Sequence, residues 1–165
     1  MPEACLKQGI DMTLKIVELI NIVISALVGG MYWGPWLALT RSLKTFDTNV
    51  FLSVVSRLNK NMAPLMTVLS PLSLFTTMLV LIISYGSQNT TFYFTLVGFV
   101  LFLTALIVTV AIEVPIVKQI VTWTETTLPT NWEQLRDRWQ KFHRVRVIAG
   151  IVGLISFLAG ALFNA

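Results

Sequence analysis

Histidine and cysteine are nearly absent from this sequence, which contains one residue of each among 165. The single cysteine, Cys5, cannot form an internal disulfide, a C-x-x-C redox pair or a thiolate metal site. The single histidine, His143, leaves no H-x-x-x-H or E-x-x-H pair of the kind that holds a metal ion. We therefore predict no metal site, and no cofactor is evident from the sequence.

Nucleotide-binding and serine-hydrolase motifs are also missing. The chain contains no G-x-G-x-x-G turn, no P-loop and no G-x-S-x-G elbow. Backbone cradles for dinucleotides or nucleoside triphosphates, and the exposed nucleophile of a hydrolase, are therefore not predicted.

Charged residues are scarce, and hydrophobic residues take their place. Only 12% of the residues are charged, whereas 55% are hydrophobic. Four apolar runs reach or approach the ~20 residues that cross a ~30 Å hydrocarbon core. They lie at residues 16–39, 62–85, 91–112 and 145–163. We predict an all-α fold, an integral membrane four-helix bundle that forms a single membrane domain over residues 1–165.

The net charge of +4 is explained by where the Lys and Arg residues lie relative to the membrane spans, so no nucleic-acid partner is predicted. Most Lys and Arg residues lie in the first and third connections between spans. The second connection, residues 86–90, has no charged residue. Because cytoplasmic loops are enriched in Lys and Arg, we predict both basic connections in the cytoplasm and both termini on the non-cytoplasmic side.

Two further helical segments are predicted next to the spans. Residues 47–61 have an apolar face, and we expect a short amphipathic helix between spans one and two that lies along the membrane surface or extends span two. Residues 131–144 are charged and run without a break into the fourth apolar run. They predict a cytoplasmic helical extension before span four. Pro71, inside span two, predicts a kink.

One face of the last helix collects polar and aromatic residues. Its members are separated by steps of four and three: Trp132, Arg136, Trp139, His143, Arg146, Gly150 and Gly153. Such spacing places them along one face of a continuous helix. The glycines allow another helix to approach closely, so the polar residues before them are predicted to point into the protein.

Glu113 ends span three at the same, cytoplasmic end of the bundle. A histidine is easily used as a base, an acid or a ligand near neutral pH, which makes His143 a candidate catalytic residue. The structural alternative is a salt bridge between Glu113 and Arg146 that locks span three to span four. His143 would then only form hydrogen bonds at that interface.

A longer pattern around these residues resembles the C-terminal signature of the anthrone-oxygenase-like family, which consists of small four-span membrane proteins. The W-x-x-x-R-x-x-W-x-x-x-H-x-x-R spacing is its most specific part. The resemblance is strongest over residues 112–150, and the residues that carry it are Glu113, Pro115, Ile116, Gln119, Ile120, Trp123, Thr124, Leu128, Pro129, Trp132, Arg136, Arg138, Trp139, His143 and Arg146.

This resemblance implies a chemistry. Characterised members of the family oxidise polycyclic anthrones to anthraquinones with dioxygen and have no established cofactor, which implies dioxygen as a co-substrate. The candidate catalytic residues are then His143, Arg146 and Glu113. Neutral His143 would remove the acidic C–H proton of the substrate, and Arg146 would stabilise the resulting enolate.

The aromatic residues of the same pattern are candidates for substrate binding. Tryptophan rings stack on flat ring systems, and a neighbouring arginine can contribute charge. The predicted substrate-binding residues are Trp132, Arg136, Trp139 and Trp123.

Two functions stay open at this point. One is an oxidoreductase-like enzyme whose hydrophobic substrate enters between helices from the cytoplasmic leaflet. The other is a non-catalytic membrane protein that binds a lipid, a quinone-like ligand or a partner protein. An enzyme and a ligand-binding protein both predict an apolar pocket of ~300–1,000 Å³ with His143 and Arg146 in its wall. A non-catalytic scaffold that binds no ligand predicts instead that those side chains form salt bridges with Glu113 and leave no pocket.

A transporter is less compatible, because the four spans show no inverted repeat. Small-residue stripes on spans one and four fit internal packing or a homo-oligomer.

Overall fold

The computed structural model describes residues 2–85 and 90–163, with side chains from residue 8 onward. All regular structure in these ranges is helical. The elements are α1 (Pro2–Ala38), the 3-10 helix η1 (Thr40–Thr45), α2 (Thr48–Ser84), α3 (Thr90–Val108), the π-helix η2 (Thr109–Glu113), α4 (Val114–Ile120) and α5 (Trp132–Leu162). Most of the predicted uncharged connection, residues 86–89, lies outside the described residues.

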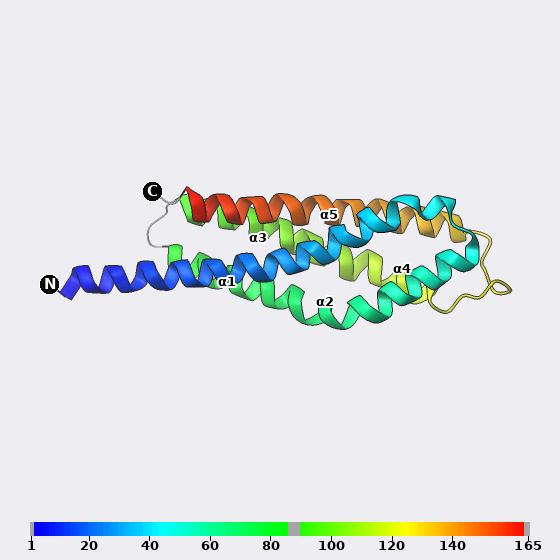
Figure 1. Ribbon diagram of the computed structural model, residues 1–165, viewed down its shortest axis with the longest axis horizontal. Helices are drawn as coiled ribbons and strands as arrows, with labels where there is room; N and C mark the ends of the chain where they lie inside the picture. The colour runs from blue at the N-terminus through cyan, green and yellow to red at the C-terminus, as the bar shows by residue number, and fades with distance from the viewer. Residues whose placement is uncertain (1, 86–89, 164–165) are drawn as a thin grey trace.

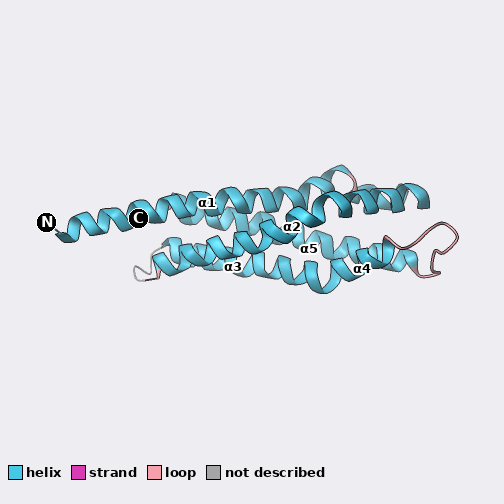
Figure 2. Cartoon of the chain, turned by 90° about the horizontal axis from the view of Figure 1, so that it is seen from below, coloured by secondary structure: helices cyan, strands magenta, loops and turns pink. Residues whose placement is uncertain are grey.

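The long helices run side by side in one bundle (Figures 1 and 2). The start of α1 and the end of α5 lie at one end, here called the terminal end. The connection η1 and residues 121–131 lie at the opposite end, here called the basic end. Helix α5 packs mainly on α3 and α1, and α2 packs mainly on α1.

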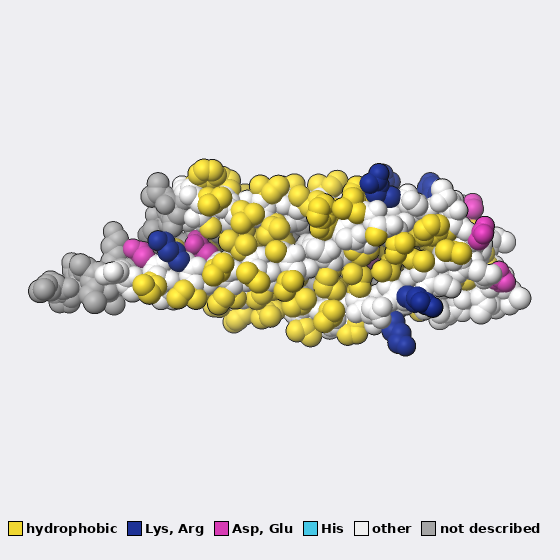
Figure 3. All heavy atoms as spheres, in the orientation of Figure 1, with side chains coloured by type: hydrophobic (Ala, Val, Ile, Leu, Met, Phe, Trp, Pro, Cys, Tyr) yellow, Lys and Arg dark blue, Asp and Glu magenta, His cyan; other side chains and the backbone are white. Residues whose placement is uncertain are grey.

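Four helical stretches are long and apolar enough to cross a membrane, which confirms the predicted all-α, four-span architecture. They are Gln8–Thr45, Thr48–Ser84, Thr90–Ile120 and Trp132–Leu162. Large apolar side chains such as Leu19, Val68 and Ile107 are exposed on the outside of the bundle. Figure 3 shows hydrophobic side chains over the middle of the molecule, with most Lys and Arg side chains nearer one end. Lipid would cover such a surface.

Residues 47–61 extend span two, which is one of the two arrangements expected for them. Helix α2 has 37 residues without a break. At 1.5 Å per residue it is about 55 Å long, much longer than the ~30 Å core. The separate short element between spans one and two is η1 instead. Both Pro64 and Pro71 lie inside α2, and the helix bends in its middle, as Pro71 predicts (Figure 1).

The helix of span three continues past its predicted end at residue 112. From Thr90 to Ile120 it is one helical run that passes through Pro115. A proline has no N–H, and its ring clashes with the carbonyl of the preceding turn. The preceding turn is a π-turn, in which the N–H of Val114 bonds to the carbonyl of Thr109 five residues back. This wider turn lets the helix pass the proline and places Glu113 at its end, only 3% exposed.

The glycines of the last helix serve internal packing. A Cβ on Gly153 would lie 2.7 Å from the ring of Phe102, and one on Gly150 would lie 3.0 Å from the ring of Tyr32. A side chain at Gly153 would therefore displace the ring of Phe102, and one at Gly150 would press on the ring of Tyr32. In α1, by contrast, a Cβ on Gly30 or Gly34 would meet no atom within 4 Å.

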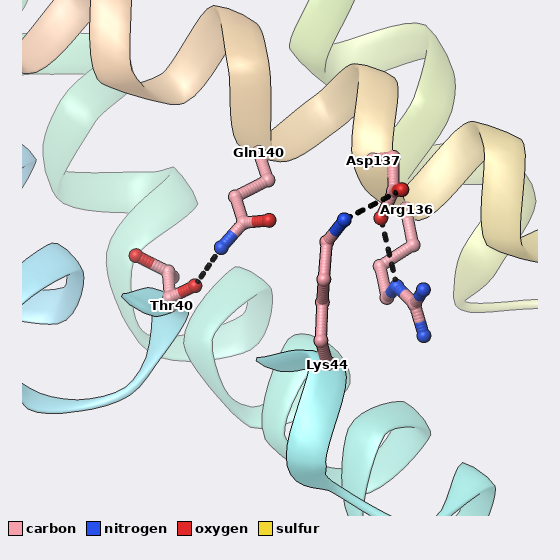
Figure 4. Close-up of polar contacts among 5 residues, drawn as sticks. All are labelled: Thr40, Lys44, Arg136, Asp137 and Gln140. Atoms are coloured by element: carbon pink, nitrogen blue, oxygen red, sulfur yellow. Dashed lines mark hydrogen bonds and ion pairs between the residues drawn. The ribbon is translucent and has the colours of Figure 1, made fainter. Parts of the chain in front are cut away.

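The basic end is closed by an apolar cluster, here called the cap, which consists of Leu43, Phe51, Val55, Ile116, Ile120 and Trp139. Polar contacts fasten η1 to α5 beside it (Figure 4). Gln140 Nε2 donates to the carbonyl oxygen of Thr40 at 2.6 Å. Lys44 Nζ lies 2.9 Å from Asp137 Oδ2, and Arg136 Nε lies 3.2 Å from Asp137 Oδ1. The connection between spans one and two is thus held down over the bundle.

Candidate functional site

A cavity of about 320 Å³ lies next to the cap, between α1, α2, α5 and the run from α3 to α4. Its volume is at the lower end of the range typical of small-molecule sites. Most of its wall is apolar and includes Met31, Val55, Leu58, Met62, Met66, Leu106 and Val117. The predicted pocket is therefore present at the predicted end of the bundle.

Three ionisable residues predicted for the site meet in the wall of this cavity: Glu113, His143 and Arg146. Arg146 Nη1 forms an ion pair with Glu113 Oε2. Arg146 Nη2 lies 2.9 Å from His143 Nδ1, and the same ring nitrogen lies 3.4 Å from Glu113 Oε1. The salt bridge between spans three and four and the pocket are both present. They were treated above as alternatives, and the structure combines them.

Neighbouring side chains fix the orientation of this cluster. Thr109 Oγ1 lies 3.2 Å from Arg146 Nη1. The ring of Tyr32 lies under the guanidinium, 4.6 Å from Cζ, which is a cation–π contact. The ring of Trp139 stacks on His143, with centroids 5.5 Å apart and planes at 20°. Three different spans therefore hold the cluster in one arrangement.

Unused hydrogen-bonding capacity is concentrated at the cavity. Five buried side-chain atoms among the described residues have no hydrogen-bond partner: Glu18 Oε1, Thr40 Oγ1, Glu113 Oε1, His143 Nε2 and Arg146 Nε. Four of the five belong to residues of the cavity wall. A buried polar atom without a partner costs about 1–3 kcal/mol. Such atoms are rare, so their concentration identifies the cavity as the candidate site.

Part of the cavity wall lies at the outer surface of the bundle, between α2 and α4. On the α2 side its wall includes the exposed residues Ala63 and Thr67, and across from them the exposed residues Val110 and Val114. Contacts between α2 and α4 are sparse here. Toward the basic end the wall includes the buried residues Thr40, Val55 and Trp139, of which Val55 and Trp139 belong to the cap, together with the exposed residue Asn59. An apolar molecule could reach the cavity between α2 and α4 without crossing the cap.

Of the four predicted substrate-binding residues, the structure brings Trp139 to the cavity. Trp132 packs on Phe51 with ring centroids 5.6 Å apart, and Arg136 lies over the ring of Trp132 at 4.9 Å. Trp123 packs against the cap as well. The helical face from residue 132 to residue 146 is about 21 Å long. It extends beyond the cavity, so its first members lie over the cap.

Sequence analysis missed several residues of the wall, above all Tyr32, Thr40 and Thr109. Polar and aromatic residues recur along span one at steps of three and four, and Tyr32 is one of them. That spacing is a signal that could have found it. Thr109 lies in an otherwise lipid-like run and gives no such signal. Among the described residues, no group of three or more His, Cys, Asp or Glu side chains could hold a metal ion.

A second buried polar cluster joins α1 to α2 nearer the terminal end. Asn21 Oδ1 accepts hydrogen bonds from the hydroxyls of Thr76 at 3.0 Å and Thr77 at 2.8 Å. The hydroxyls of Ser25 and Ser73 lie 2.8 Å apart. These five residues are here called the Asn21 cluster. All five are buried, and none has a buried polar atom without a partner.

Residues 54–156 match the model of a protein family described as anthrone oxygenase. The matched range contains Glu113, His143 and Arg146, whereas Tyr32 and Thr40 lie before it. No curated protein and no solved structure matches the chain.

Proposed function

The chain belongs to the anthrone oxygenase family, and from this premise we propose that it is an oxidoreductase of the oxygenase type. Its substrate is a hydrophobic, polycyclic or quinone-like compound dissolved in the membrane, and dioxygen is the oxidant. For an anthrone, one molecule of substrate and one of dioxygen give one anthraquinone and one water.

The observation that carries this proposal is the coincidence of an apolar cavity with the unpartnered polar atoms of its wall. The apolar side chains suit a flat ring system, and a few convergent polar groups fix the orientation of such a ligand. Four of the five buried, unpartnered polar atoms in the described part of the chain belong to wall residues. An ordinary packed interior pairs such atoms within the protein.

The chemistry requires a base and a way to stabilise negative charge. Loss of a proton from the CH₂ group of an anthrone leaves an enolate, which dioxygen oxidises to a hydroperoxide. The hydroperoxide loses water and becomes the second carbonyl. Glu113, His143 and Arg146 offer a carboxylate, an imidazole and a guanidinium within one cluster. Such groups act as bases and stabilise oxyanions.

The position of the cavity supports a substrate that comes from the bilayer. Exposed wall residues lie between α2 and α4, on a surface that lipid would cover. Dioxygen is apolar and reaches the site by the same route. The many Lys and Arg residues at this end favour a cytoplasmic location for it, with both termini on the other side.

Oxygen uptake tests the proposal directly. The purified protein in detergent is given an anthrone, and the rate without protein is subtracted because anthrones oxidise slowly in air. We expect His143→Ala to lower the protein-dependent rate by at least 100-fold, the usual size of the effect when a group that acts on the developing enolate is lost. Arg138→Ala is the matched control, because Arg138 is an exposed cation on the same helix. The proposal fails if His143→Ala and Arg138→Ala turn over every accepted substrate as fast as the unaltered protein.

A second candidate function is ligand binding without catalysis. The observation in its favour is that Glu113 and Arg146 already neutralise each other in the cavity wall. Purification in mild detergent followed by mass spectrometry separates the two. A lipid or quinone-like molecule that is retained by the unaltered protein and lost from Arg146→Ala, without any oxygen uptake, would favour a binding protein.

A further inference from the structure

The hydrogen bond between Arg146 and His143 determines which ring nitrogen carries the proton. A guanidinium has only donors and stays protonated in proteins. Arg146 Nη2 lies 2.9 Å from His143 Nδ1, so Nδ1 must be the acceptor in this bond and has no proton. A neutral imidazole carries one proton. In this arrangement that proton is on Nε2.

The groups around the ring leave neither ring nitrogen of His143 available to accept a proton from a substrate. A proton on Nδ1 would place two N–H donors face to face across the 2.9 Å contact with Arg146. In the described part of the chain the other charged group that contacts the ring is Glu113, with Oε1 at 3.4 Å from Nδ1. Trp139 covers one ring face. The nitrogen that remains for a ligand is Nε2, which already carries a proton and has no partner in the protein.

Glu113, in turn, has a hydrogen-bond acceptor that is not satisfied. Its Oε2 pairs with Arg146, whereas Oε1 is buried and accepts no hydrogen bond. The nearby Nδ1 cannot satisfy it, because that nitrogen has no proton to donate. The cluster therefore presents one unused donor, His143 Nε2–H, and one unused carboxylate acceptor, Glu113 Oε1.

We propose that His143 donates a hydrogen bond to the carbonyl oxygen of the substrate, and that Glu113 Oε1 is the base that removes its C–H proton. This division of roles rests on the proposed function and reverses the role that the sequence alone suggests for His143. In the step, the C–H bond breaks and its proton moves to Glu113 Oε1. The electron pair stays on the substrate as an enolate, whose oxygen accepts the hydrogen bond from Nε2–H. No oxidant takes part in this step. Dioxygen acts afterwards, and the proton on Glu113 leaves with the water that is formed.

The same arrangement of charges and hydrogen-bonding atoms limits which molecules can bind in the cavity. Glu113 and Arg146 balance each other's charge, so the cavity favours a neutral molecule over an anion. The ligand needs a carbonyl acceptor for Nε2–H and an acidic C–H in conjugation with it. A carboxylate base working with a neutral imidazole donor is an established arrangement for proton removal near a carbonyl.

The proton position can be measured without any substrate. Because His143 is the only histidine, ¹⁵N-histidine labelling of the whole protein gives NMR signals from this ring alone. In the unaltered protein we expect a neutral ring with the proton on Nε2 at pH 7, and in Arg146→Leu we expect a proton on Nδ1, which then has Glu113 Oε1 as its acceptor. Arg144→Leu, which removes an exposed cation next to the ring in sequence, should leave the signals unchanged. A charged ring, or a proton on Nδ1, in the unaltered protein overturns the proposal.

The roles are tested by deuterium exchange into the CH₂ group of an anthrone in D₂O without oxygen. His143→Gln keeps an N–H donor but cannot act as a base, whereas His143→Leu has neither. We expect His143→Gln to retain at least a tenth of the exchange rate, and His143→Leu and Glu113→Gln to lose at least 100-fold. Thermal unfolding of each variant in detergent shows that the comparison is between folded proteins.

The two proposals fail in different ways. Equal loss in His143→Gln and His143→Leu, with exchange retained in Glu113→Gln, would make His143 the base and overturn the division of roles. No exchange by the unaltered protein would also overturn it. Exchange with the expected pattern but no oxygen uptake would leave the division of roles standing and refute the proposed oxidation.

Discussion

Two buried polar clusters lie in this bundle, and they differ in what their polar atoms do. In the Asn21 cluster, neutral side chains of α1 and α2 satisfy one another and no buried atom is left without a partner. In the cavity cluster, Glu113, His143 and Arg146 are ionisable, and each keeps one buried atom unpaired. Satisfied polar groups hold transmembrane helices together. Ionisable groups inside membrane-spanning helices mark a candidate functional site, above all where some of their hydrogen-bonding atoms have no partner in the protein.

Glu18 shows why burial alone is a poor guide. It is 7% exposed, lies one helical turn before Asn21, and also has an unpaired oxygen. It does not line the cavity described above. What distinguishes the cavity cluster is the combination of opposite charges, unpaired atoms and an adjoining space.

The largest difference between the two clusters is expected when one charge of the cavity cluster loses its partner. Glu113→Leu removes the partner of Arg146, whose side chain is 12% exposed, and we expect it to lower the free energy of unfolding by about 3–5 kcal/mol. In the double variant Glu113→Leu/Arg146→Leu most of this loss should be recovered, because no charge stays unpaired. Unfolding in mixed micelles, followed by circular dichroism, measures both. A double variant as unstable as the single one would contradict the assignment.

The Asn21 cluster should respond in the opposite manner, with a loss of stability and no loss of activity. Asn21→Leu removes the oxygen that accepts from Thr76 and Thr77, although both hydroxyls keep bonds to backbone carbonyls. We expect a decrease of about 1–2 kcal/mol in the free energy of unfolding. Oxygen uptake per folded protein should be unchanged. Val23→Leu, on the exposed side of the same helix, is the control. A decrease in turnover comparable to that of His143→Ala would remove the distinction between the clusters.

Access to the cavity can be narrowed without touching either cluster. Ala63 lies in the exposed part of the wall, and Ala63→Trp should raise the KM for an anthrone about tenfold. The expected change in unfolding free energy is within about 0.5 kcal/mol, as for other surface substitutions. Leu65→Trp is the matched control, since Leu65 is exposed on the same helix and does not line the cavity. Equal KM values in both variants would argue for another entrance.

The smallest effect is expected at the exposed ion pair beside the cap. The side chains of Lys44 and Asp137 are 58% and 43% exposed, so water and salt screen their attraction. Lys44→Ala should lower the free energy of unfolding by about 0.2–1 kcal/mol. The difference should shrink when unfolding is repeated at high salt. A loss as large as that of Glu113→Leu would mean that exposure does not separate this pair from the buried one.

Much of the fold followed from local patterns. The lengths of the apolar runs predicted four spans, and the four-and-three spacing on the last helix predicted that His143 and Arg146 share a face. Their pairing with Glu113 was predicted as the structural alternative, because opposite charges at one end of a bundle tend to meet. The continuation of span three through Pro115 was not predicted, since a π-turn depends on how the carbonyls before the proline are accommodated.

The sequence by itself determined the class of the protein, its four membrane-crossing helices and its family, because hydrophobic length and residue spacing are properties of single segments. Only the tertiary structure decided which polar residues surround the cavity. It brought Tyr32 from α1 under Arg146 and left Trp132 and Trp123 over the cap. These placements depend on how far each helix is shifted along its neighbours, and side-chain packing between segments distant in sequence sets that shift. The same packing left Glu113, His143 and Arg146 each with one buried atom that has no hydrogen-bond partner.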